Sequence, residues 1–161
     1  MNAYLSFALY EPDMPQNVGA IVRLGAALGC PLELIEPFGF VFDPRKLGRS
    51  ALDYHRRATL RRHGSWAAFE RWRAEAGARL VLLSTHAATP YTAATFRPGD
   101  ILLCGRESAG VPAAVHAAAD LAVVVPLAPG VRSLNVVTAL AMVAGEARRQ
   151  LGGRASDGSR P

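Results

Sequence analysis

Short apolar runs alternate along the chain with segments whose apolar residues recur at helical spacing. The run over residues 3–10 is rich in aromatic and branched residues and predicts a strand, and residues 32–35 predict a second, shorter one. Runs over 80–83, 101–104 and 121–125 are apolar at every position, which is typical of strands covered on both faces. The pattern therefore predicts five strands.

The segments between and after these strands predict helices. Helical spacing of apolar residues predicts helices over 17–28, 66–76, 112–119 and 134–151. Gly29 is expected to end the first helix, and Ser65 is expected to cap the second. Residues 38–63 are expected to be irregular, because glycines and a proline interrupt them.

Strands that alternate with helices indicate an α/β fold, a mostly parallel sheet with helices on both faces. The length of 161 residues is that of one domain, and the sequence contains no internal repeat. We expect a single domain over residues 1–151, followed by a flexible polar tail over 152–161. A domain of this size can bury a core without disulfides or metal ions.

The last predicted helix has no polar face in its first half. Its apolar residues in that half are Leu134, Val136, Val137, Leu140, Met142 and Val143. A helix that is apolar all round is buried on all sides. Either a second subunit covers it, or the helix lies wholly inside the domain.

Composition predicts a soluble protein of the cytoplasm with no membrane partner. Half of the residues are apolar and 19% are charged, which excludes a disordered chain. Cys30 and Cys104 lack CxxC spacing and are expected to be buried thiols, as in a reducing compartment. No apolar run reaches the roughly 18 residues that span a bilayer, and residues 1–10 contain no basic signal-peptide region.

Positive charge is concentrated in one segment. The net charge is +5, and residues 45–63 contain seven arginines and lysines against one acid, so they carry +6 and the remaining residues −1. Such a patch is typical of a protein that binds a polyanion, such as a nucleic acid. The alternative is an arginine-rich solvated surface, since 17 of the 18 basic residues are arginine.

Motifs of common nucleotide-binding and hydrolytic enzymes are absent from the sequence. It has no GxGxxG after the first strand, no GxxxxGK[ST] and no GxSxG, and its four histidines show no metal-ligand spacing. Three polar, glycine-bearing segments remain, at 17–23, 105–112 and 125–135. They follow apolar runs, and open α/β sheets bind ligands at the carboxyl ends of their strands.

Each of these segments also has a purely structural interpretation. Asn17 can cap a helix while Arg23 lies on the surface, and residues 105–112 can be a turn with two glycines. In the third segment, Ser133 or Asn135 is expected to cap the last helix.

Taken together, the three segments resemble the three motifs of the SPOUT class of RNA methyltransferases. Residues 17–23 match N-x-G-x-x-x-R, residues 105–112 match G-x-E-x-x-G-[VL]-P, and residues 125–139 match [IV]-P-[LM] followed by S-[LM]-N-x-x-x-A. Within that class the chain looks like the group that 2′-O-methylates the wobble nucleotide of tRNA. The resemblance covers about residues 3–151.

The resemblance implies a fold, a methyl donor and an assembly. The fold is a SPOUT-type sheet with a C-terminal trefoil knot, in which the segment after Val125 passes through a loop near Gly105. The donor is S-adenosylmethionine, and by position its site would be lined by Leu83, Gly105, Val125, Leu127, Ser133 and Leu134. The active protein is a homodimer, with the first and last helices packed across the interface.

The reaction that the resemblance implies is methylation of a ribose 2′-hydroxyl. The target is the wobble nucleotide of tRNA, a cytidine or a modified uridine, with leucine isoacceptors as the expected substrates. The resemblance assigns catalysis to Arg23, Asn17, Glu107 and Asn135. Since an arginine stays protonated, Arg23 is expected to position the ribose or phosphate and to stabilise the developing alkoxide, rather than to act as a base. No metal is expected, because the methyl group of the donor is already activated.

The basic segment is expected to serve as the tRNA-binding surface, because this branch of the class lacks a separate RNA-binding domain. The expected contacts are Arg45, Lys46, Arg49, Arg56 and Arg57. The chain departs from its relatives at 136–138 and at Gly145, where small polar residues and a tyrosine are common. Two alternatives stay open, a SPOUT ribose methyltransferase acting on another RNA and a non-catalytic RNA-binding dimer.

Overall fold

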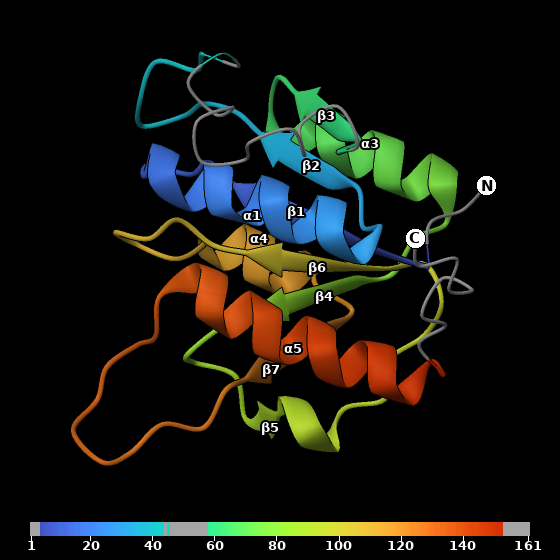
Figure 1. Ribbon diagram of the computed structural model, residues 1–161, viewed down its shortest axis with the longest axis vertical. Coiled ribbons are helices and arrows are strands. Elements are labelled where there is room, and N and C mark those ends of the chain that lie inside the picture. Colours follow the sequence, from blue (N-terminus) through green and yellow to red (C-terminus); the bar gives the residue numbers. More distant parts are fainter. Residues whose placement is uncertain (1–3, 44, 46–57, 153–161) are drawn as a thin grey trace, which may run out of the picture.

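A seven-stranded sheet forms the centre of the molecule in the computed structural model, which describes residues 4–43, 45 and 58–152 (Figure 1). The strand order is β3-β2-β1-β6-β4-β7-β5, and every neighbouring pair is parallel. The strands are β1 Leu5–Tyr10, β2 Leu32–Ile35, β3 Leu60–His63, β4 Leu80–Leu83, β5 Thr89–Pro90, β6 Asp100–Cys104 and β7 Leu121–Val124. The expected α/β fold with a parallel sheet is confirmed.

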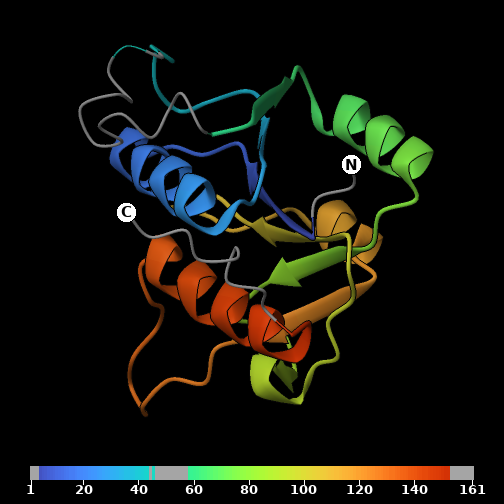
Figure 2. The same cartoon turned by 45° about the vertical axis from the view of Figure 1, so that its right-hand side comes forward.

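Helices cover both faces of this sheet (Figure 2). They are α1 Pro15–Leu28, α3 Trp66–Ala76, α4 Ala113–Ala118 and α5 Val136–Gln150, with a short 3₁₀ helix, η2, at Tyr91–Ala93. The helices α1 and α5 pack on one face, whereas α3 and α4 pack on the other. Gly29 ends α1 in the left-handed conformation, with φ of 69°, and the Ser65 hydroxyl caps α3 by accepting from the Ala68 N–H at 3.1 Å.

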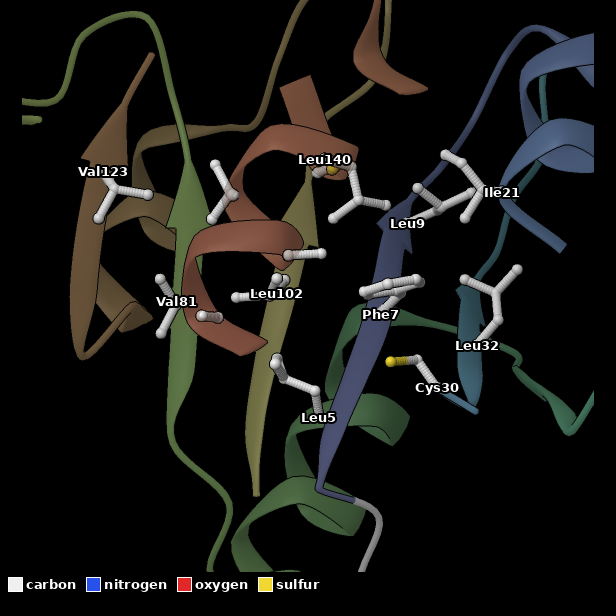
Figure 3. Packing of buried hydrophobic residues seen from close by; sticks show 14 of the residues in the cluster. Leu5, Phe7, Leu9, Ile21, Cys30, Leu32, Val81, Leu102, Val123 and Leu140 are labelled. Atoms are coloured by element: carbon white, nitrogen blue, oxygen red, sulfur yellow. The ribbon is translucent and has the colours of Figure 1, made fainter. Parts of the chain in front are cut away.

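Successive residues of a strand enter two different cores, because side chains alternate between the faces of a sheet. Phe7 and Leu9 point toward α1 and α5, into the core drawn in Figure 3. Ala8 and Tyr10 belong to the opposite core, with Phe69 of α3. Both faces are therefore buried, which explains why the central strands are apolar at every position.

The helix α5 buries one face and exposes the other. Leu140 and Val143 are fully buried, whereas Met142 is 40% exposed and Gly145 on the same side is also exposed. The guanidinium of Arg148 donates to the backbone carbonyl of Leu28 at 2.7 Å and so ties α5 to α1. The interpretation of a wholly internal helix is wrong, and an apolar stripe of α5 remains on the surface of the protomer.

Two strands depart from the sequence prediction. The edge strand β3 lies within 38–63, where the pattern predicts irregular structure. The short strand β5, with η2 after it, follows β4 in a segment where the pattern predicts no strand. Among the residues that the structure describes, β3 pairs with β2 alone, and polar contacts hold it there. They join Arg61 to Glu33 at 3.5 Å, His63 to Glu33 at 2.7 Å and Arg62 to Glu36 at 2.8 Å. Such cross-strand pairs stabilise a sheet edge without an apolar run.

Both cysteines are buried and free, as expected. Burial, together with the nearby Glu107 charge, raises the pKa of the Cys104 thiol to about 12. Within the part of the chain that the structure describes, no helix is both long and apolar enough to cross a membrane.

Candidate active site

The carboxyl ends of the central parallel strands meet at one edge of the sheet. There the loops that follow β4, β6 and β7 surround a cavity of about 540 Å³, together with the first turn of α1. This volume lies in the range that encloses a small organic ligand, roughly 300–1,000 Å³. All six residues expected to hold the methyl donor line the cavity: Leu83, Gly105, Val125, Leu127, Ser133 and Leu134.

The loop after β6 closes tightly upon itself. The Arg106 N–H donates to the Gly110 carbonyl at 3.0 Å, and the Gly110 N–H donates back to the Arg106 carbonyl at 2.7 Å. Gly110 has a φ of 65°, a conformation that favours glycine. A Cβ on Gly105 would lie 2.7 Å from the backbone carbon of Gly110, so this position has no room for a side chain.

Three of the four expected catalytic residues form one hydrogen-bonded chain. The amide of Asn135 donates to Asn17 Oδ1 at 3.2 Å, and Asn17 Nδ2 donates to Glu107 Oε1 at 3.2 Å. All three residues line the cavity, although they come from segments far apart in sequence. The structure thus brings Asn17, Glu107 and Asn135 together.

The structure also decides between two capping interpretations. Asn135 Oδ1 accepts from the Val137 N–H at 2.8 Å, so Asn135 caps α5 and at the same time orients Asn17. Asn17 itself lies inside α1, is only 5% exposed, and the residue at the helix start is Met14. The interpretation of Asn17 as a helix cap is wrong, and its buried amide serves the polar chain.

Arg23 lies further along α1 and outside the residues that line the cavity. Its side chain is exposed. Six residues of α-helix correspond to roughly 9 Å along the axis and about 240° around it, so Arg23 and Asn17 leave the helix in different directions. The structure does not bring Arg23 into the cavity beside the other three.

The expected RNA-binding residues fall mostly outside the part described. Arg45 is exposed, and its guanidinium contacts Asp43 at 3.2 Å. Lys46, Arg49, Arg56 and Arg57 lie outside the described residues. Their expected role stays a prediction.

A second carboxyl, which the sequence analysis missed, lies behind Glu107. The N–H of Asp13 donates to Glu107 Oε2 at 3.1 Å, and the Ser108 hydroxyl donates to Asp13 Oδ2. Hydrogen bonding with Glu107 lowers the pKa of Asp13, whereas burial and the contact with Asp13 raise the pKa of Glu107. The position of Asp13 just after β1, at the ligand-binding edge of a parallel sheet, is the signal that identifies it.

Histidines 86 and 116 also line the cavity and were likewise not expected there. Among residues 4–43, 45 and 58–152, no group of three or more histidine, cysteine, aspartate or glutamate side chains is placed to hold a metal ion. The polar groups around the cavity are suited to orienting a hydroxyl group and accepting hydrogen bonds from it.

Comparison with known proteins yields matches along nearly the whole chain. The model of the SpoU rRNA Methylase family matches residues 4–145. A tRNA (cytidine(34)-2′-O)-methyltransferase of Beijerinckia indica is 59% identical over 145 residues, which are 90% of this chain and 91% of the relative.

Solved structures agree with this similarity. One, described as giving structural insights into the 2-OH methylation of C/U34 on tRNA, has a TM-score of 0.88 and 43% identity, covering 96% of this chain and 100% of the other. The SpoU methyltransferase AviRb from Streptomyces viridochromogenes, solved in complex with AdoMet, has a TM-score of 0.82 and 28% identity, covering 95% of this chain and 63% of that one.

Proposed function

The chain belongs to the SpoU rRNA Methylase family, and we propose that it methylates the ribose 2′-hydroxyl of nucleotide 34, the wobble nucleotide, of tRNA. The observation that carries this proposal is the union of the three motif segments around one cavity, where Asn17, Glu107 and Asn135 form a single polar chain. Relatives named for 2′-O-methylation of cytidine 34 in tRNA match nearly end to end, which supports the same target.

The methyl donor in this proposal is S-adenosylmethionine, which supplies an activated, electrophilic methyl group. The cavity fits a donor of this kind, since apolar side chains line part of it and the tight loop at Gly105 also lines it, where backbone atoms can approach a ligand closely. Leu83, Val125 and Leu127 would supply apolar contacts. The residues Gly105, Ser133 and Leu134 would supply backbone groups, and no metal takes part in the proposed reaction.

The residues of the chain have separate tasks toward the acceptor. The 2′-hydroxyl is a weak nucleophile, so it must be oriented and its proton must be accepted as it attacks. Glu107 faces the cavity and accepts hydrogen bonds, while Asn17 and Asn135 hold its carboxyl in place. Arg23, which lies outside the residues that line the cavity, holds the ribose or its phosphate in this proposal, because its guanidinium is always charged and has several N–H donors.

The protein acts as a homodimer in this proposal. The exposed apolar stripe of α5, which includes Met142, supports a second copy as its cover, because a monomer exposes few such contiguous stripes. The helix α1 contacts α5 through Arg148 and Leu28 and would join the same interface.

The fold carries a C-terminal trefoil knot in this proposal. The loops 105–111 and 125–135 line the same cavity, and α5 follows the second loop to the face covered by α1. Threading of the segment after Val125 through the loop near Gly105 agrees with both placements. An experimental structure with continuous density over residues 100–140 tests this threading.

The proposed substrate is tRNA, and the proposed location of the protein is the cytoplasm, where tRNA is modified. Leucine isoacceptors, with cytidine or a modified uridine at position 34, are the proposed substrates. Mass spectrometry of tRNA nucleosides from cells with and without this protein tests the function. Loss of 2′-O-methylation at position 34 in the deletion strain is the expected result. Loss of a methyl group from ribosomal RNA instead would favour a different RNA as substrate.

A further inference from the structure

The carboxyl of Asp13 is placed against Glu107 in a way that leaves one of its oxygens without a donor. The Ser108 hydroxyl donates to Asp13 Oδ2, while Asp13 Oδ1 is buried and has no hydrogen-bond donor among the described residues. A buried, unsatisfied carboxylate oxygen is costly, so it needs a proton or a donor nearby. The neighbouring group able to provide one is the carboxyl of Glu107, whose Oε2 accepts from the Asp13 N–H at 3.1 Å.

We propose that Asp13 is a positioning residue for the methyl transfer: it shares one proton with Glu107 and, through Glu107, takes up the proton that the ribose 2′-hydroxyl loses. This inference rests on the proposed function. It also supplies the proton acceptor that Arg23 cannot be, because a guanidinium stays protonated.

The electrostatics of the Asp13 and Glu107 carboxyls favour one proton shared between them. Two neighbouring carboxylates repel each other, so one of them keeps its proton to a higher pH. Burial raises the pKa of Glu107, the carboxyl that faces the cavity, whereas hydrogen bonding with Glu107, and then with Ser108, lowers the pKa of Asp13. In this proposal Glu107 carries the shared proton and donates it to Asp13 Oδ1, which gives that buried oxygen the donor it lacks.

The proton transfer balances as a relay across Glu107. As the ribose oxygen bonds to the methyl carbon, the carbon–sulfur bond breaks and its electron pair stays on sulfur. The 2′-hydroxyl proton passes to the Glu107 oxygen that faces the cavity, while the proton already on Glu107 passes to Asp13. Both carboxyls end protonated, so the pair goes from a charge of −1 to neutral, and solvent removes the extra proton afterwards.

Other titratable groups surround the pair on several elements. Arg106 of the same loop is engaged by Glu11 after β1, donating to its carboxylate and, at 3.2 Å, to its backbone carbonyl. The Cys104 thiol at the end of β6 stays neutral, since its pKa is about 12. His86, in the loop after β4, and His116, in α4, also line the cavity.

The test compares Asp13→Asn with the wild type and with Glu75→Gln, a control that makes the same carboxyl-to-amide change on the exposed side of α3. Single-turnover methylation of tRNA is measured from pH 5 to 9, with donor affinity measured by calorimetry. We expect Asp13→Asn to lower the plateau rate by about tenfold to a hundredfold, toward the lower end of what proton acceptance contributes. Donor affinity and the control should stay at wild-type values.

The pH profile separates a proton role from a structural one. In Asp13→Asn, Glu107 itself must be ionised to accept the proton of the 2′-hydroxyl. The acidic limb of the plot of methylation rate against pH should therefore lie at higher pH than in the wild type. A lower rate with an unmoved limb, or a wild-type rate, would overturn the proposal.

A second measurement does not depend on activity. Carbon-13 NMR of carboxyl-labelled glutamate should show one resonance, that of Glu107, which titrates above the ordinary glutamate range and moves to lower pH in Asp13→Asn. An ordinary titration of Glu107 in the wild type would refute the shared proton even in an enzyme that methylates nucleotide 34. Absence of methylation by the wild type, with the shared proton present, would refute the proposed function and with it the role of Asp13 in methyl transfer, while the shared proton itself would stand.

Discussion

Replacing Gly105 by alanine tests whether the loop after β6 cradles the methyl donor. The added Cβ would lie 2.7 and 2.8 Å from two backbone carbons of Gly110. Restoring an ordinary contact requires Gly110 to move by roughly 0.8 Å or more, since carbon atoms pack at about 3.5 Å. The loop is closed by two backbone hydrogen bonds between Arg106 and Gly110, so the whole turn must move with it.

The cost of this overpacking sets the expected loss of affinity. Inserting a methyl group into a closely packed site costs about 1–3 kcal/mol. In the ligand-free variant the displaced turn can move into the cavity. Binding of S-adenosylmethionine must then move the turn out of the cavity again. A cost in that range corresponds to a dissociation constant for S-adenosylmethionine that is about 5- to 150-fold higher.

Calorimetric titration with S-adenosylmethionine measures the effect, and Gly64→Ala is its control. Gly64 lies before α3, has no left-handed φ, and its added Cβ would meet nothing within 4 Å. The control should bind the donor as the wild type does, and both variants should unfold cooperatively. A Gly105→Ala dissociation constant within twofold of the wild type would refute a close approach of the donor to this loop.

Three further predictions concern catalysis, RNA binding and assembly. Arg23→Ala should lower single-turnover methylation about a hundredfold or more, because it removes a preorganised hydrogen-bond donor, and should leave the affinity for S-adenosylmethionine unchanged. Arg23→Lys should restore little of the rate. A near wild-type rate for Arg23→Ala would remove Arg23 from the mechanism. Neutralising the basic residues of 45–57 should weaken tRNA binding and flatten the slope of log K against log salt by about 0.7–0.9 per contact, measured by filter binding; an unchanged slope would show a merely solvated surface. Met142→Asp should shift the mass measured by light scattering from dimer to monomer at micromolar concentration, because it charges the apolar stripe of α5; a dimer of unchanged mass would place the interface elsewhere.

Most of the sheet could be predicted from the sequence because its central strands bury both faces. Their side chains enter two cores, so the runs at β4, β6 and β7 are apolar at successive positions and easily recognised. The edge strand β3 contains Arg61 and Arg62, which look solvated in the sequence. Its place depends on partners about 30 residues away in the chain, Glu33 and Glu36, and local periodicity carries no information about them.

The candidate site could be predicted where it depends on strand ends and glycines. The segments around Gly105 and Asn135 follow strands, and parallel strands bring their carboxyl ends to one edge. Asp13 escaped notice because an acid beside prolines after a strand resembles an ordinary turn. The direction of Arg23 could not be predicted either, since it depends on how α1 is rotated against the sheet.

The most direct measurement of the central claim is the position of the methyl group that the purified protein adds. Unmodified tRNA is incubated with the protein and S-adenosylmethionine that carries a deuterated methyl group, then digested and sequenced by mass spectrometry. We predict that the label lies on the ribose of nucleotide 34. The amount of label should be strongly reduced with Asn17→Ala, which removes the centre of the polar chain between Glu107 and Asn135. Label on a base, on another nucleotide or on no nucleotide at all would contradict the function proposed for this protein.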